Sequence, residues 1–292
     1  MRLGAIVPAI SSFAVWGRYL STGTLKRLPI DLVTNEFGFS FSPAGWNYFR
    51  AAVAEYEANP GVDLEQSTFF RFFQHEEIRS VRYLNDLLFL HDPALRTRGF
   101  KFYLGTYPWS DHVGGGPWGH HFDAVSGKST RDLYGFRQNI WYQPGDPRPI
   151  ELEWKKTIQL YESLKISRYR PFRQRDLPEL TLLVRRDGAI RAVRYNGQHR
   201  LSIVSHFGHR KVTGLIPSAD SINESLKTWT SFSDLPKVVH DGEVMVCESD
   251  FENWPYVKRG LCTADEALRI FHAFFELNGR ERIQYLGIPS VY

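Results

Sequence analysis

A glycine, an amide, an imidazole and a guanidinium stand side by side at residues 197–200, with the sequence GQHR. They follow a segment expected to be a strand and precede a short apolar run that ends at Gly208 and is expected to be a helix. A reversal between strand and helix often needs a backbone conformation open only to glycine. The first N–H groups of a helix lack intrahelical partners and lie in the positive potential of its dipole. The pattern therefore indicates a place that can hold a phosphate.

The side chains of this tetrapeptide leave two interpretations open. Arg200 can add a bidentate contact to a phosphate, and His199 can add a further donor. Alternatively, Gly197 is only a turn, and Arg200 pairs with an acidic neighbour such as Glu162. The spacing alone does not decide between them.

The elements around the tetrapeptide follow a clear order. Residues 150–165, IELEWKKTIQLYESLK, place their apolar side chains on one helical face. The strands LTLLV (180–184) and AIRAVRYN (189–196) flank Asp187-Gly188, a strong hairpin signal. KVTGLIP (211–217) is expected to be a further strand. The order from residue 150 to residue 217 is therefore helix, strand, strand, helix, strand.

This order, with LYESLK on the first helix and NGQHRLSIVSHFG after the hairpin, resembles the core of the ParB/sulfiredoxin superfamily over residues 155–217. In that superfamily a helix with an S-I-K-like segment precedes a strand that ends in G-x-x-R or G-x-H-R. The resemblance implies nucleotide binding at the loop and the helix end. It implies phosphate contacts from Gly197, Gln198, His199 and Arg200, with Glu162, Ser163 and Lys165 near the same pocket.

The superfamily carries out several reactions, and this chain departs from two of them. Sulfiredoxins use ATP to phosphorylate a sulfinic acid, relatives phosphorylate free serine, and ParB proteins bind and hydrolyse CTP. The position of the sulfiredoxin cysteine is Gln198 here, which argues against sulfinic-acid repair. The segment after Pro217 shows no helix-turn-helix, which argues against a partition role. The wider pattern also resembles proteins of bacterial surface-polysaccharide gene clusters and suggests a sugar or glycolipid acceptor.

The Gly-, Trp- and His-rich segment 99–149 shows no sustained period, and a loop of this length usually carries function. Asp123 is, with Glu162, a candidate base for the acceptor hydroxyl, and His120 and His121 are candidates for substrate binding. A metal site is an alternative, although Mg²⁺ prefers oxygen ligands and the histidines lack a zinc-type spacing. Histidines that are hydrogen-bonded within an ordered loop are the plainest interpretation. No residue is assigned as a metal ligand.

A basic run interleaved with aromatic residues covers 165–175, KISRYRPFRQR. Such a run can follow a phosphate backbone, bind an anionic substrate or form a solvated face. Its proximity to the tetrapeptide favours an anionic substrate, with Arg173 as a binding residue. The net charge of +4 argues against nucleic acid as the partner.

The composition indicates an ordinary globular protein: 292 residues, 42% hydrophobic and 23% charged, with two cysteines in no metal-binding or disulfide pattern. A reducing, cytoplasmic setting fits best. The apolar run at 3–16 is too short for a membrane span and contains Pro8. Residues 3–20 can instead contact a membrane surface peripherally or pack against the core.

Three further helices are expected from their patterns. The first covers residues 42–61, with Ser42 as its N-cap and Pro43 in its first turn, and the second covers residues 76–90. The third begins at Thr263, which forms a capping box with Glu266.

The expected fold is α+β, with a ParB/sulfiredoxin-like mixed-sheet core at 150–217. A helical N-terminal region at 1–98 and the loop segment at 99–149 precede the core, and a helical extension at 218–292 follows it.

The expected function is a nucleotide-dependent, kinase-like phosphotransferase. It uses ATP or another nucleoside triphosphate, with Mg²⁺, and acts on a small-molecule, sugar or glycolipid hydroxyl. A nucleotide-binding regulatory or partner-binding protein without transfer activity is the alternative.

Overall fold

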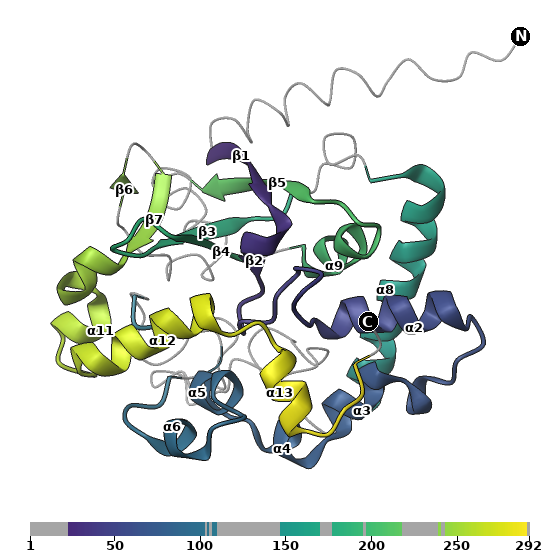
Figure 1. The fold of residues 1–292 in the computed structure, drawn as a ribbon, viewed down its shortest axis with the longest axis horizontal. Coiled ribbons are helices and arrows are strands. Elements are labelled where there is room, and N and C mark those ends of the chain that lie inside the picture. The colour runs from purple at the N-terminus through teal and green to yellow at the C-terminus, as the bar shows by residue number, and fades with distance from the viewer. Residues whose placement is uncertain are drawn as a thin grey trace, which may run out of the picture.

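The structure is a computed structural model that describes residues 23–102, 104, 107–109, 147–169, 177–194, 197–217, 239–240 and 243–290. It is mixed α+β, with two small sheets to which helices from both ends of the chain are joined (Figure 1). The sequence predictions made for residues 3–20, His120, His121, Asp123 and Arg173 lie outside the described residues.

The larger sheet has five strands in the order β2-β4-β3-β7-β6. Their bounds are β2 Val33–Thr34, β4 Ile190–Arg194, β3 Leu180–Val184, β7 Glu243–Cys247 and β6 Val239–His240. β3 and β4 form the expected antiparallel hairpin, with Leu182 opposite Ala192, while β2 pairs parallel with β4 and β7 parallel with β3. The turn between β3 and β4 uses Gly188 at φ 82°, as the Asp-Gly pair predicts.

The second sheet joins the start of the described chain to the core segment. β1 (Gly23–Pro29) pairs antiparallel with β5 (Lys211–Pro217) over seven residues. The N-terminal region, expected to be helical, therefore also contributes strands to both sheets. The C-terminal extension, expected to be helical, contributes β6 and β7.

The helix–strand–strand–helix–strand order of the core segment is confirmed. α8 (Pro147–Ser167) precedes the hairpin, and α9 (Gln198–His206) lies between β4 and β5. α8 and α9 lie beside α2 (Tyr48–Ala58) in Figure 1. Their facing side chains form a small apolar cluster made of Val53, Tyr161, Leu164 and Ile203.

The N-terminal helices begin and end differently from the sequence prediction. Ser42 does not cap a helix: its hydroxyl donates to Asp31 at 2.5 Å and accepts from the N–H of Ala44 at 3.1 Å. α2 begins five residues after Pro43, where the side chain of Asn47 accepts from the N–H of Phe49. The Ser42 hydroxyl is therefore bound to the Asp31 carboxylate instead of capping a helix, as the local pattern suggested.

The helix expected at 76–90 is two helices, because the chain turns at Val81. The helices of this region are α3 Thr68–Gln74, α4 Glu76–Ser80, α5 Leu84–Leu88 and α6 Pro93–Thr97. Short 3-10 helices occupy Ile30–Leu32 and Leu64–Gln66.

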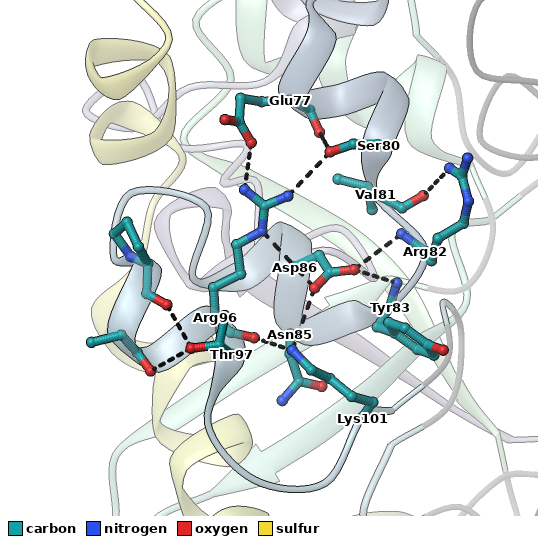
Figure 2. A network of polar contacts seen from close by, with 12 residues as sticks. Glu77, Ser80, Val81, Arg82, Tyr83, Asn85, Asp86, Arg96, Thr97 and Lys101 are labelled. Carbon is teal, nitrogen blue, oxygen red and sulfur yellow. Dashed lines mark hydrogen bonds and ion pairs between the residues drawn. The ribbon is translucent and has the colours of Figure 1, made fainter.

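A polar network fixes these short helices to one another (Figure 2). Arg96 forms an ion pair with Glu77, and its Nε lies 3.9 Å from Oδ1 of Asp86, which also lies 3.5 Å from Nζ of Lys101. The second oxygen of Asp86 accepts from two backbone N–H groups at the start of α5, at 3.1 and 3.0 Å. All the drawn acidic groups have cationic or backbone partners, so the network serves the fold.

The C-terminal part packs on the same core. It contains the 3-10 helix Glu248–Asn253 and the helices α11 Pro255–Lys258, α12 Ala264–Glu276 and α13 Arg280–Tyr285. The capping box at Thr263 and Glu266 is confirmed. One large apolar cluster includes Phe49 of α2, Val193 of β4 and Phe271 of α12, so the segments 1–98, 150–217 and 218–292 all contribute to it.

Arg282 is a fully buried cation at the centre of this arrangement. Its guanidinium donates to the carbonyl groups of Phe37 and Gly38, each at 2.6 Å, and lies 3.7 Å from the ring centre of Phe39. Burial lowers the pKa of Arg282. The side chain joins α13 to the loop after β2 and satisfies buried carbonyl groups that water does not reach.

We expect Arg282→Met to lower the free energy of unfolding by about 3 kcal/mol, because it leaves buried carbonyl groups without donors. Arg280→Met is the matched control on the same helix: Nε of Arg280 donates to the carbonyl group of Ala44, and its loss should cost about 1 kcal/mol. Urea denaturation measures both. Equal losses for the two variants would contradict the role given to Arg282.

Candidate functional site

The turn between β4 and α9 has the conformation that the glycine predicts. Gly197 has φ 85° and ψ 23°, in the left-handed region, and it is the N-cap of α9 without a side-chain capping bond. A Cβ at this position would lie 3.3 Å from Cα of Pro178, closer than most real contacts. The position therefore needs glycine both for its backbone angle and for the close approach of Pro178.

The first turn of α9 is half-buried rather than enclosed in the core. Residues 197–200 all have intermediate exposure, and the helical bonding begins where the N–H of Leu201 donates to the carbonyl group of Gly197 at 3.0 Å. The N–H groups of residues 198–200 precede that first bond and have no carbonyl group one turn earlier in the helix. The amino end of α9 is thus an electropositive helix end formed by partly exposed residues.

The side chain of Gln198 is directed to buried partners and not to a ligand. Its Oε1 accepts from Nη2 of Arg194 at 2.9 Å and from the hydroxyl of Tyr48 at 3.4 Å. Arg194 is buried and forms an ion pair with Glu36. Gln198 can therefore offer its backbone N–H to a bound anion, while its side chain fixes the turn.

A buried polar network beneath the turn extends from Tyr48. The Nδ2 of Asn35 donates to the Tyr48 hydroxyl at 3.0 Å, and Oδ1 of Asn35 accepts from the N–H groups of Phe37 and Phe39 at 3.0 and 2.9 Å. Sequence reasoning missed Asn35, Glu36 and Arg194. Arg194 alone carried a signal, because it is a charged residue at the end of the strand directly before the predicted turn.

His199 is paired with a carboxylate that the sequence did not single out. Its Nε2 lies 2.8 Å from Oε2 of Glu153 on α8, and its ring centre lies 4.2 Å from that of Phe49 on α2. The Glu153 side chain is 13% exposed and also accepts from Lys156 at 2.9 Å. Burial raises the pKa of Glu153, but the bonds and charges of His199 and Lys156 outweigh it and lower the pKa below its usual value.

The structure does not bring Glu162, Ser163 and Lys165 to the amino end of α9. Glu162 is hydrogen-bonded to Tyr56, and Nζ of Lys165 lies 5.3 Å from the ring centre of Tyr161. α8 and α9 run in the same direction. Glu153, near the start of α8, pairs with His199 at the start of α9, and later residues of α8 lie near the end of α9. Glu162 is nine residues beyond Glu153, which is about 13 Å along α8.

A second glutamate–histidine pair holds the carboxyl end of α9. His206 lies with its Nε2 at 2.7 Å from Oε2 of Glu57, and the buried Tyr161 donates its hydroxyl to Oε1 of Glu57 at 2.7 Å. The hydrogen bonds from Tyr161 and His206 lower the pKa of Glu57. Burial and the neighbouring Glu57 raise the pKa of Tyr161. α9 is therefore fixed to α8 and α2 at both ends.

The remaining candidate residues are placed only in part. Arg200 lies in the half-buried first turn of α9. Asp123, His120, His121 and Arg173 lie outside the described residues, so their roles stay predictions. Among the residues whose positions are described, no group of three or more histidine, cysteine or acidic side chains is arranged to hold a metal ion. Within the same residues, no helix combines the length and apolar character that crossing a membrane requires.

We expect the pH dependence of stability to report the Glu57 pair. A carboxyl group whose folded pKa is lowered stabilises the protein above its unfolded pKa, about 4.3, and loses that stabilisation as the pH falls through the folded value. Glu57→Gln should therefore reduce the loss of the urea midpoint between pH 6 and pH 3. An acid-induced loss identical to that of the unsubstituted protein would contradict the assignment.

Comparisons with known proteins give no relative from which a function could be carried over. A scan against protein-family models, a search of the curated proteins and a search of the solved structures each found no match.

Proposed function

We propose that the chain is a nucleotide-dependent phosphotransferase that holds the phosphates of ATP, or of another nucleoside triphosphate, at the amino end of α9. The proposal is carried by the left-handed Gly197, which begins a half-buried helix end and supplies no side-chain cap of its own. Backbone N–H groups and the helix dipole favour a bound anion there.

The order of elements supports the same proposal. α8, the β3–β4 hairpin, α9 and β5 follow one another as in the ParB/sulfiredoxin-like core that the sequence resembles, with GQHR at the start of α9. In that superfamily this helix end contacts nucleotide phosphates.

Each residue of the tetrapeptide then has a separate role. The N–H groups of Gln198, His199 and Arg200 bind phosphate oxygens, and the Arg200 guanidinium stabilises charge on the transferring group. Mg²⁺ would be held mainly by the phosphates and water, which is its usual mode with nucleotides. The acceptor is proposed to be a hydroxyl of a small molecule, a sugar or a glycolipid.

One observation favours a second candidate function, a nucleotide-binding regulatory protein without transfer activity. Glu162, a carboxylate expected to act as the base, lies beside Tyr56, near the carboxyl end of α9. A protein that only binds the nucleotide and changes its affinity for a partner needs no base. The two candidates share the phosphate site and differ in whether the γ-phosphoryl group leaves ATP.

We expect Gly197→Ala to weaken ATP binding at least tenfold, because the new Cβ strains the left-handed residue and pushes against Pro178. Gly208→Ala is the matched control: Gly208 also has a positive φ, 78°, but it follows the carboxyl end of α9 and has open space around its Cβ position. Isothermal titration calorimetry with ATP and Mg²⁺ measures both. Equal affinities for the two variants would remove the phosphate site from α9.

Transfer is tested with ATP labelled in its γ-phosphate, Mg²⁺ and a panel of sugars, amino acids and glycolipid headgroups. We expect the label to move to one class of hydroxyl compound, and the Gly197→Ala variant to lose this transfer. Tight ATP binding with no labelled product, not even phosphate released to water, would favour the regulatory candidate instead. Failure to bind ATP, CTP or GTP would remove both.

A further inference from the structure

We propose that His199 takes the proton from the acceptor hydroxyl and that Glu153 orients its imidazole for this step. The inference rests on the proposed phosphotransferase function and gives the role of base to His199 in place of Glu162, which lies beside Tyr56. In this assignment His199 is the catalytic residue, and Glu153 is a positioning residue that acts through it.

The pair is built from three helices. Glu153 comes from α8, His199 from the first turn of α9, and the ring of Phe49 on α2 packs against the imidazole. The His199 side chain is 24% exposed and the Glu153 side chain 13%, so both are largely buried while the imidazole keeps some access to solvent. A low local dielectric strengthens the hydrogen bond between them and fixes the ring orientation.

The hydrogen bond also determines which ring nitrogen is available. An ionised carboxylate only accepts, so Nε2 of a neutral His199 carries the proton and Nδ1 keeps its lone pair. Lys156 also donates to the Glu153 carboxylate, at 2.9 Å, which favours its ionised form. Among the residues whose positions are described, none is hydrogen-bonded to Nδ1 of His199. In this geometry His199 is a base, and its other ring nitrogen, Nε2, donates to a carboxylate that fixes the orientation of the ring.

The position of His199 on α9 suits the reaction. In the proposed function the backbone N–H of His199 binds the phosphates, so its side chain begins beside the bound nucleotide. The acceptor oxygen attacks the γ-phosphorus and forms a new P–O bond, while the bond between γ-phosphorus and the bridging oxygen of the nucleoside diphosphate breaks. The hydroxyl proton moves to Nδ1 of His199, and the diphosphate leaves with the electron pair.

The pair at the other end of α9 provides the comparison. Glu57 and His206 have the same donor and acceptor at a similar distance, 2.7 Å, and also connect α9 to a neighbouring helix. His206 lies seven residues after His199, about 10 Å along the helix, at the end where the dipole repels phosphate. A glutamate-to-glutamine change at Glu57 therefore removes a similar tie without touching the proposed base.

The first experiment compares Glu153→Gln with Glu57→Gln in the whole chain. The side-chain amide of a glutamine at 153 can donate to Nε2, which places the ring proton on Nδ1 and blocks proton acceptance. We expect kcat for γ-phosphoryl transfer from ATP, to water or to the hydroxyl compound found with the panel, to fall about 10²-fold or more. KM for ATP should change less than threefold, and Glu57→Gln should keep kcat within about twofold.

The second experiment separates proton transfer from packing. We expect His199→Ala to lose transfer but keep ATP binding. Added imidazole should raise the transfer rate of this variant at least tenfold, because it can occupy the space beside Phe49 and Glu153. A structural tie between α8 and α9 would not be restored in this way. Thermal melting of each variant, with and without ATP, shows whether it is folded.

The outcomes are distinguishable. If the unsubstituted chain transfers no phosphate to any acceptor, the proposed function fails and the inference fails with it. If the unsubstituted chain transfers phosphate and Glu153→Gln keeps kcat, or if both glutamine variants lose it equally, the proposed function stands and the base is not His199. Loss of kcat in Glu153→Gln alone, with imidazole rescue of His199→Ala, supports the assignment.

Discussion

The left-handed backbone of Gly197 is the constraint on which the arrangement around α9 depends. It turns the chain from β4 into α9 while Pro178 lies against the glycine, and a side chain would meet that proline at 3.3 Å. Since glycine has no side-chain oxygen, the first N–H groups of α9 are left without a cap from this residue. The same residue that makes the turn possible therefore leaves the helix end open to an anion.

Polar contacts then hold this helix end in a fixed position. Gln198 is tied to Arg194 and Tyr48 inside the protein, and His199 is tied to Glu153 on α8. Buried polar groups of this kind are costly unless their partners are present, so the two side chains and the turn are ordered before any ligand arrives. Ordering the site in advance lowers the entropy that binding must remove and keeps the imidazole in one orientation.

The sequence predicts what local pattern determines and misses what packing determines. The hairpin at Asp187-Gly188, the glycine turn into α9 and the capping box at Thr263 are local, and all three are confirmed. β1 and β2 pair with strands more than 150 residues away, and no local pattern shows such pairing. Glu153 escaped notice for the same reason: on α8 it is one acidic residue among several, and only the parallel packing of α8 and α9 brings it, and not Glu162, to His199.

Binding of a phosphate group at the amino end of α9 is best tested by a structure with a ligand. Crystals of the whole chain would be soaked with Mg²⁺ and an ATP analogue whose γ-phosphate cannot be transferred. We expect phosphate oxygens within hydrogen-bond distance of the backbone N–H groups of residues 198–200, with Arg200 on the γ-phosphate. A nucleotide bound elsewhere, with those N–H groups facing only water, would contradict it.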